Sequence, residues 1–188
     1  PLTFRALTLP FAALGLLLVA RMSGDPIRIP REWWGRVAIL AFFNIAGWNG
    51  FVLFGVQQLP AGRSAILAYT MPVWAALLAR PILGERLTRL RSAALVLCVV
   101  GLAVLVAPLI ADGIPGGALL AVASGLSWAA GTVYIKWARI EGDPLAVTIW
   151  QLIVAFVVIT ACLPLVEGSL HLWPVHGEAL FGLLYTGV

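Results

Sequence analysis

Amide and aromatic side chains recur inside otherwise apolar stretches of this sequence. Asn44 and Trp48 lie four residues apart, which places them on one face of a helix, and Asn49 is adjacent to Trp48. Polar groups in an apolar environment are costly and usually face a cavity or another helix. An amide can contact a small molecule, bond to a neighbouring helix or border a water-lined face. All three interpretations stay open for these residues.

A proline in the middle of a long apolar run forms a second group with its polar neighbours. Tyr69, Thr70 and Trp74 flank Pro72. Proline has no backbone N–H, so the carbonyl of Ala68 loses its usual helical donor. That carbonyl needs a partner where water is excluded. The pattern predicts a kink, which either is purely structural or widens a cavity and offers the carbonyl to it.

A third group lies in the apolar stretch 117–137. Ser127 and Tyr134 share one helical face. Trp128 offers a stacking surface and an N–H donor, which suits either ligand binding or interior packing. A stripe of small residues at every fourth position favours close packing against another helix: Ala121, Gly125 and Ala129.

Groups that could hold a metal or perform catalysis are scarce. His171 and His176 have no ligand partners at metal-binding spacing, and Cys98 and Cys162 lie inside apolar runs as small core residues. No Asp or Glu lies in the middle of an apolar stretch. Arg5, one turn inside the first stretch, is either a snorkelling side chain or a charge in a cavity. We expect no metal, no cofactor and no enzymatic activity.

The elements that carry these residues follow from composition. The chain has 188 residues, of which 62% are hydrophobic and 11% charged, and its mean hydropathy is +1.02. Soluble domains average about 25% charged residues, so this chain is an integral membrane protein. A membrane-spanning helix needs about 20 apolar residues. The sequence predicts an all-α polytopic protein with six spans and the start of a seventh: 2–20, 37–58, 64–83, 92–110, 117–137, 145–166, and 178 onward.

Basic residues fall on alternate connections between these spans. Ten of the 12 Lys and Arg residues lie on the first, third and fifth connections, and Arg5 and Arg63 are the exceptions. An excess of Lys and Arg marks cytoplasmic loops. The cytoplasmic loops are therefore predicted near 21–36, 80–91 and 136–144. The net charge of +4 comes from few residues, and we expect no nucleic-acid partner.

Several charged residues mark this predicted cytoplasmic boundary. Glu85, Arg86 and Arg89 follow the third span, and Lys136 ends the fifth. Glu85 is within reach of Arg86 and Arg89, which predicts a salt-bridged turn rather than a proton carrier. Lys136 is expected to snorkel to the lipid head groups.

The order of the spans contains a further pattern. Segments 1–20 and 143–164 share a Pro-Leu opening and a similar length, and each precedes a turn with tryptophan and proline. They are five spans apart, so they cross the membrane in opposite directions. An inverted repeat of this kind is typical of secondary transporters, although two apolar segments can also resemble each other by chance.

Residues 59–108 resemble the most recognisable part of the EamA-type transporters of the drug/metabolite transporter superfamily. The shared features are the Pro60-Ala61-Gly62 turn, mid-helix Pro72, the run Leu83-Gly84-Glu85-Arg86-Leu87, and Gly101. "ASGLSWAAGTVYIKWA" (123–138) is similar to the first helix of the family's second half. One departure is Pro81, which leaves the end of the third span open.

The resemblance implies ten helices arranged as two five-helix repeats of inverted topology. On that template, 1–110 is the first repeat without its first helix, and 117–188 is the second repeat up to the start of its third helix. The implied function is export of a small metabolite, such as an amino acid, by alternating access across the bacterial cytoplasmic (inner) membrane. Proton coupling and a homodimer stay open, as do a membrane-embedded enzyme and a non-transporting scaffold.

Overall fold

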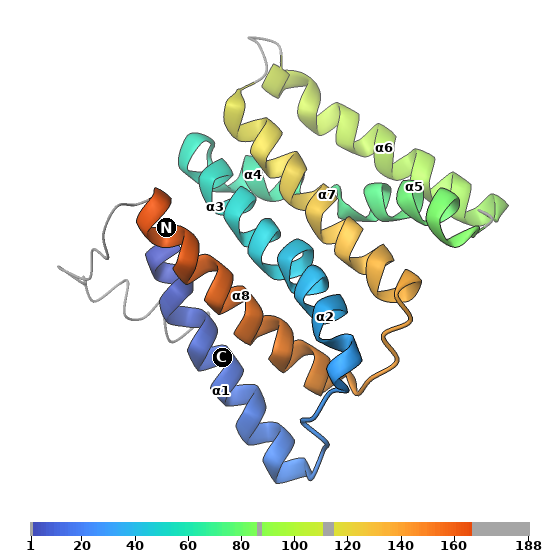
Figure 1. Ribbon diagram of the computed structural model, residues 1–188. Helices are drawn as coiled ribbons and strands as arrows, with labels where there is room; N and C mark the ends of the chain where they lie inside the picture. Colours follow the sequence, from blue (N-terminus) through green and yellow to red (C-terminus); the bar gives the residue numbers. More distant parts are fainter. Residues whose placement is uncertain (1, 86–87, 111–114, 167–188) are drawn as a thin grey trace. The chain divides into compact units, whose positions relative to one another are not determined.

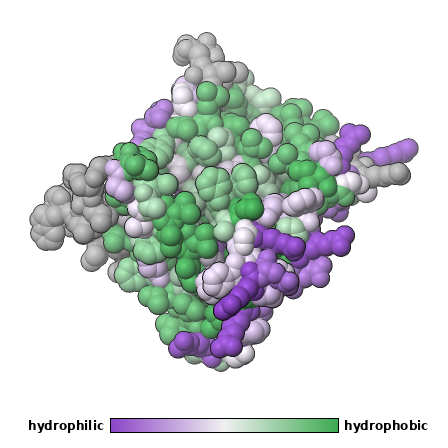
Figure 2. Space-filling view, viewed as in Figure 1, coloured by the Kyte–Doolittle hydropathy of each residue, from purple (hydrophilic) through white to green (hydrophobic). Residues whose placement is uncertain are grey.

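The computed structural model describes residues 2–85, 88–110 and 115–166, and every secondary-structure element in these ranges is helical. Six segments are long and apolar enough to cross a membrane, which confirms the six predicted spans. The predicted seventh span, from 178 onward, lies outside the described residues. Figure 2 shows a largely apolar surface on which hydrophilic residues gather in a few patches.

Contacts between Cα atoms divide the chain into two compact units. One comprises Pro1–Ala46 and Ile140–Val188, and the other comprises Gly47–Arg139. This division cuts across the two sequence repeats expected at 1–110 and 117–188, which stay a prediction.

The first unit pairs two long helices. Its elements are α1 (Leu2–Ser23), the 3-10 turn η1 (Arg31–Trp33), α2 (Trp34–Ala41), most of η2 (Phe42–Gly47) and α8 (Pro144–Val166). Both α1 and α2 pack on α8 (Figure 1). Small buried residues recur in these helices, such as Ala13 and Ala20 on α1 and Ala155 on α8. They let the helix backbones approach closely without large side chains between them.

The start of α8 is held by specific hydrogen bonds. The carboxylate of Asp143 accepts from the backbone N–H groups of Leu145 (2.8 Å) and Ala146 (3.0 Å). This is a helix cap, which satisfies donors that have no partner within the helix. One and a half turns later, the indole N–H of Trp150 donates to the carbonyl of Ile27 at 3.0 Å. This hydrogen bond anchors the loop between α1 and η1 to helix α8.

The second unit is organised around α7. Its elements are α3 (Trp48–Gln58), α4 (Ala61–Ala68), α5 (Met71–Leu83), α6 (Arg89–Ile110) and α7 (Gly116–Trp137). Helix α7 packs against α3, α4 and α5, whereas α6 has few contacts with α4 and α5. A methyl group on Gly117 would lie 2.7 Å from Cβ of Gln58, so α3 and α7 are in close contact. Ala121 and Ala129 of the predicted small-residue stripe are fully buried.

The predicted kink in the third span is a complete break. Helix α4 ends at Ala68 and α5 begins at Met71, so the span is two helices joined at Tyr69 and Thr70. Pro72 lies in the first turn of α5, where its lack of an N–H costs nothing. The break comprises Tyr69 and Thr70, and Met71, the residue before Pro72, already belongs to α5. The second half continues through Pro81 to Leu83.

A feature that the sequence did not predict lies in the second span. Residues Phe42–Gly47 form a π-helical segment between α2 and α3. The boundary between the two compact units, Ala46 and Gly47, falls within it. Segments of π-helix are rare in proteins as a whole, but those that occur are often found at functional sites.

Candidate functional site

The broken span places its freed carbonyl directly against α7. A methyl group on Gly125 would lie 2.7 Å from the Ala68 carbonyl oxygen and 2.8 Å from the Thr70 hydroxyl. Only a glycine hydrogen fits between α7 and the break. The Ala68 carbonyl, which lost its helical donor to Pro72, therefore faces the backbone of α7 at Gly125.

The two aromatic residues beside the break have different environments. The Trp74 indole N–H donates to the Thr70 hydroxyl at 3.0 Å, and Thr70 is buried. The indole N–H is the only polar group of the Trp74 side chain, and this local bond already occupies it. Tyr69 is 70% exposed. Of the residues that flank Pro72, Tyr69 is thus the one whose side chain is open to a partner.

Two candidate tryptophans lie against each other about one turn farther along α7. The rings of Trp48 on α3 and Trp128 on α7 form an edge-to-face pair, with ring centroids 5.8 Å apart and an interplanar angle of 63°. The indole nitrogen of Trp48 is buried and has no hydrogen-bond partner among the described residues. A buried donor without a partner costs about 1–3 kcal/mol. An acceptor on a bound molecule would remove this cost.

The remaining sequence-predicted residues of the second unit lie on the same two helices. Asn49 on α3 and Ser127 on α7 are buried. Tyr134, two turns beyond Ser127, contacts Trp137 with ring centroids 5.8 Å apart. Helices α3 and α7 therefore carry most of the polar and aromatic candidates, and they are in direct contact with each other.

The first unit carries an amide pair that the sequence revealed only in part. Asn44 lies in the π-helical segment, and its Nδ2 donates to Oε1 of Gln151 at 3.5 Å. Gln151 is buried near the middle of α8. The Asn44 carbonyl oxygen is also buried and has no hydrogen-bond partner among the described residues. Asn44 thus makes an interhelical contact and retains an acceptor for a further donor.

Gln151 was missed by sequence reasoning although a signal was present. It is the one amide residue between Pro144 and Val166, a helix that is otherwise strongly apolar. A lone polar group in such a span indicates a function or an interhelical bond.

A cluster of charged side chains lies where the end of α5 meets α6 and α7 in the second unit. The Glu85 carboxylate lies 3.4 Å from the Lys136 ammonium and 3.9 Å from the Arg91 guanidinium. Lys136 and Arg91 are thus partners of Glu85 that the sequence did not indicate, and the expected turn with Arg86 stays a prediction. Arg86 lies outside the described residues, and Arg89 is exposed at the start of α6. These exposed ion pairs contribute little to stability.

Two other predictions concern isolated groups. The Nε of Arg5 is buried and has no hydrogen-bond partner among the described residues, while the residue as a whole is half-buried. Within the described ranges, no cluster of His, Cys, Asp or Glu could hold a metal ion. His171 and His176 lie outside those ranges.

Comparison with known proteins identifies the class. The EamA-like transporter family model matches residues 1–107, more than half of the chain. A solved crystal structure has the same fold, with a TM-score of 0.71 and 23% identity over 100% of this chain and 65% of that one. The chain belongs to the EamA-like transporter family, and it is an all-α polytopic membrane protein.

Individual relatives agree with this assignment. The chain is 28% identical to a WAT1-related chloroplastic protein of Arabidopsis thaliana, over 93% of this chain and 44% of that protein. It is 30% identical to the uncharacterized transporter YvbV of Bacillus subtilis, over 84% and 52%. It is 32% identical to a riboflavin transporter of Rhizobium johnstonii, over 61% and 36%. The chain thus spans about half the length of the curated relatives that it matches.

Proposed function

We propose that the full-length protein is a secondary transporter that moves a small metabolite across the bacterial cytoplasmic (inner) membrane by alternating access. The observation that carries the proposal is the buried Trp48 indole N–H beside Trp128, which has no hydrogen-bond partner among the described residues of a transporter-family fold. A buried polar group without a partner inside a membrane span is costly, and a substrate that supplies the acceptor offsets that cost.

The proposed substrate carries a hydrogen-bond acceptor and a flat or apolar portion. The acceptor, such as a carboxylate, would bond to Trp48, and the Trp48–Trp128 pair offers a surface for the apolar portion. An amino acid or a related compound, moved in the export direction, supplies such an acceptor in its carboxylate.

Transport by the full-length protein in proteoliposomes tests this proposal. Counterflow should be measured with a broad panel of amino acids and with riboflavin, because one relative carries that name. Accumulation of labelled amino acid in vesicles loaded with the unlabelled compound is the expected result. Accumulation of riboflavin alone would assign a different substrate class, and the absence of counterflow for every compound would contradict the proposal.

The orientation of the protein is part of the same proposal. The loops near 21–36, 80–91 and 136–144 are placed in the cytoplasm because they hold most of the basic residues. Single cysteines introduced at Arg28 and at Arg139 should react with a membrane-impermeant maleimide only after cells are opened. Labelling of either one in intact cells would contradict this orientation.

A further inference from the structure

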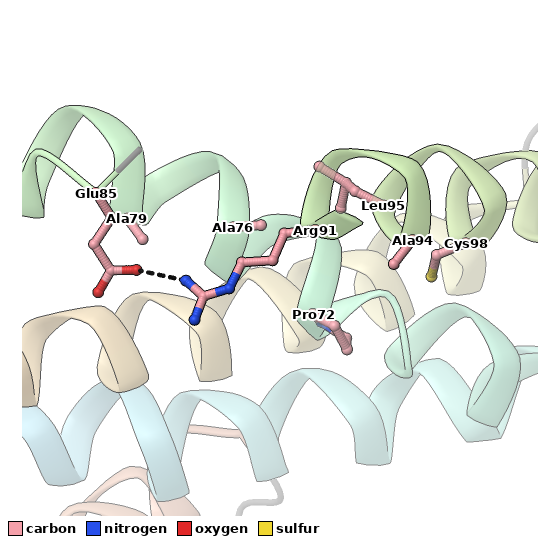
Figure 3. Close-up of a pocket in the computed structure, with 8 residues that line it drawn as sticks. All are labelled: Pro72, Ala76, Ala79, Glu85, Arg91, Ala94, Leu95 and Cys98. Carbon is pink, nitrogen blue, oxygen red and sulfur yellow. Dashed lines mark ion pairs between the residues drawn. The ribbon is translucent and has the colours of Figure 1, made fainter. Parts of the chain in front are cut away.

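An apolar cavity lies between α5 and α6 of the second unit. Its volume is about 290 Å³. One face of each helix forms a wall, because the lining residues recur at helical spacing. Figure 3 shows the apolar lining residues, which are Pro72, Ala76 and Ala79 on α5 and Ala94, Leu95 and Cys98 on α6.

The cavity exists because both walls carry small side chains where the helices diverge. Ala76 and Ala79 face it from α5, and Ala94 faces it from α6. Ala94 and Cys98 are exposed, so the cavity is accessible from outside the unit. An accessible apolar cavity within the bilayer is occupied by hydrocarbon, since lipid tails are as apolar as leucine.

One end of this cavity is charged. Glu85 and Arg91 line it and lie 3.9 Å apart, as the dashed line in Figure 3 shows. Lys136 is 3.4 Å from the same carboxylate. Two cationic side chains thus accompany one carboxylate, and the side chains of Arg91 and Lys136 are more than half exposed. This end of the cavity has a net positive charge that favours an anionic head group.

We propose that this groove between α5 and α6 binds one anionic phospholipid, with its phosphate on Arg91 and Lys136 and an acyl chain along Ala76, Ala79 and Ala94. The apolar walls and the charged end then match the two parts of one molecule. Basic pockets between membrane helices are known to hold anionic head groups. The proposal depends neither on the transported substrate nor on which leaflet contains the charged end.

Native mass spectrometry of the full-length protein in detergent tests the proposal directly. Phosphatidylglycerol and phosphatidylethanolamine with identical acyl chains are titrated separately. We expect one phosphatidylglycerol to bind in preference to phosphatidylethanolamine. Arg91→Gln should weaken this binding about fivefold, and Ala79→Leu, which fills the groove without changing charge, should weaken it by a similar or larger factor.

Controls use an arginine outside the groove and the two cysteines. Arg63→Gln removes a positive charge from the start of α4 and should leave binding unchanged. Phosphatidylglycerol should slow the reaction of Cys98 with N-ethylmaleimide in a Cys162→Ala variant. It should not slow the reaction of Cys162, which is exposed on α8, in a Cys98→Ala variant.

Three results would overturn the proposal. Equal binding of both lipids would show that the groove does not select an anionic head group. Equal binding by the wild type, Arg91→Gln and Ala79→Leu would place the lipid elsewhere. A Cys98 that is unreactive in lipid-free detergent would show that another part of the full-length protein covers the groove.

Discussion

Helices α6 and α7 have the same length and a similar apolar composition, yet their environments are opposite. Each has 22 residues. In the most hydrophobic part of each helix, 44% of the α7 residues are buried inside the structure, against none of the α6 residues whose burial the structure describes. On α7, Gly or Ala at every fourth position lets the neighbouring helices approach closely. Hydrophobicity alone therefore does not determine which helix forms the centre of a membrane protein.

Two glycines on α7 each permit a close approach of another segment. Gly117 approaches Gln58 and Gly125 approaches the break between α4 and α5. The contact at Gly117 brings the helix that carries Trp128 against the one that carries Trp48. The proposed substrate contacts thus depend on the packing of α7, and the lipid groove depends on the loose packing of α6.

The strongest test of this comparison exchanges one glycine on each helix for alanine. Gly125→Ala places a methyl group 2.7 Å from the rigid Ala68 carbonyl, and we expect a loss of about 3 kcal/mol in the free energy of unfolding. Gly101→Ala on α6 meets nothing within 4 Å and should cause no loss. Thermal unfolding of the full-length protein in detergent measures both. Equal stability of the two variants would contradict the close packing of α7 at the break.

A smaller effect is expected from the hydroxyl group at the break. Thr70→Val keeps the side-chain shape but removes the acceptor of the Trp74 indole N–H, which should cost about 1–2 kcal/mol. Thr132→Val is the matched control, because the Thr132 hydroxyl bonds to the Trp128 carbonyl in its own helix and is exposed. Unfolding and Trp fluorescence should change for Thr70→Val alone. A similar change in both variants would show that the Thr70–Trp74 hydrogen bond stabilises the protein no more than an exposed hydroxyl does.

The smallest effect is expected on α6. Leu97 is 74% exposed, and Leu97→Ala exchanges one lipid-facing apolar side chain for another, so unfolding should change by less than about 0.5 kcal/mol. Val133→Ala on α7, where Val133 is 3% exposed, should cost about 1 kcal/mol. A large loss from Leu97→Ala would mean that α6 is covered in the full-length protein.

Much of the fold was predictable because the relevant physics is local. Each span is limited by the bilayer thickness and by charged or turn-forming residues, so the predicted segments 117–137 and 145–166 nearly match α7 and α8. The break ahead of Pro72 follows from its missing N–H, which leaves the Ala68 carbonyl without its helical donor. The packing stripe followed from four-residue spacing.

The features that the sequence did not reveal depend on partners far along the chain. The π-helical segment contains Asn44, whose hydrogen bond reaches Gln151, 107 residues later. Glu85 pairs with Lys136, 51 residues later, as well as with the nearby Arg91. Trp74 was a candidate for substrate contact, but its donor bonds to Thr70. Which of several polar neighbours a side chain contacts is decided by packing, and composition and spacing do not contain that information.

The central claim is that the buried Trp48 indole N–H binds the substrate, and Trp48→Phe tests it most directly. This change keeps an aromatic ring next to Trp128 and removes only the donor. Trp137→Phe is the control, because Trp137 is 60% exposed at the end of α7. For a compound that the wild-type protein transports in proteoliposomes, we predict that Trp48→Phe raises the half-saturation concentration about tenfold, as expected for one lost hydrogen bond, and that Trp137→Phe leaves it unchanged. Unchanged transport by Trp48→Phe would contradict the claim.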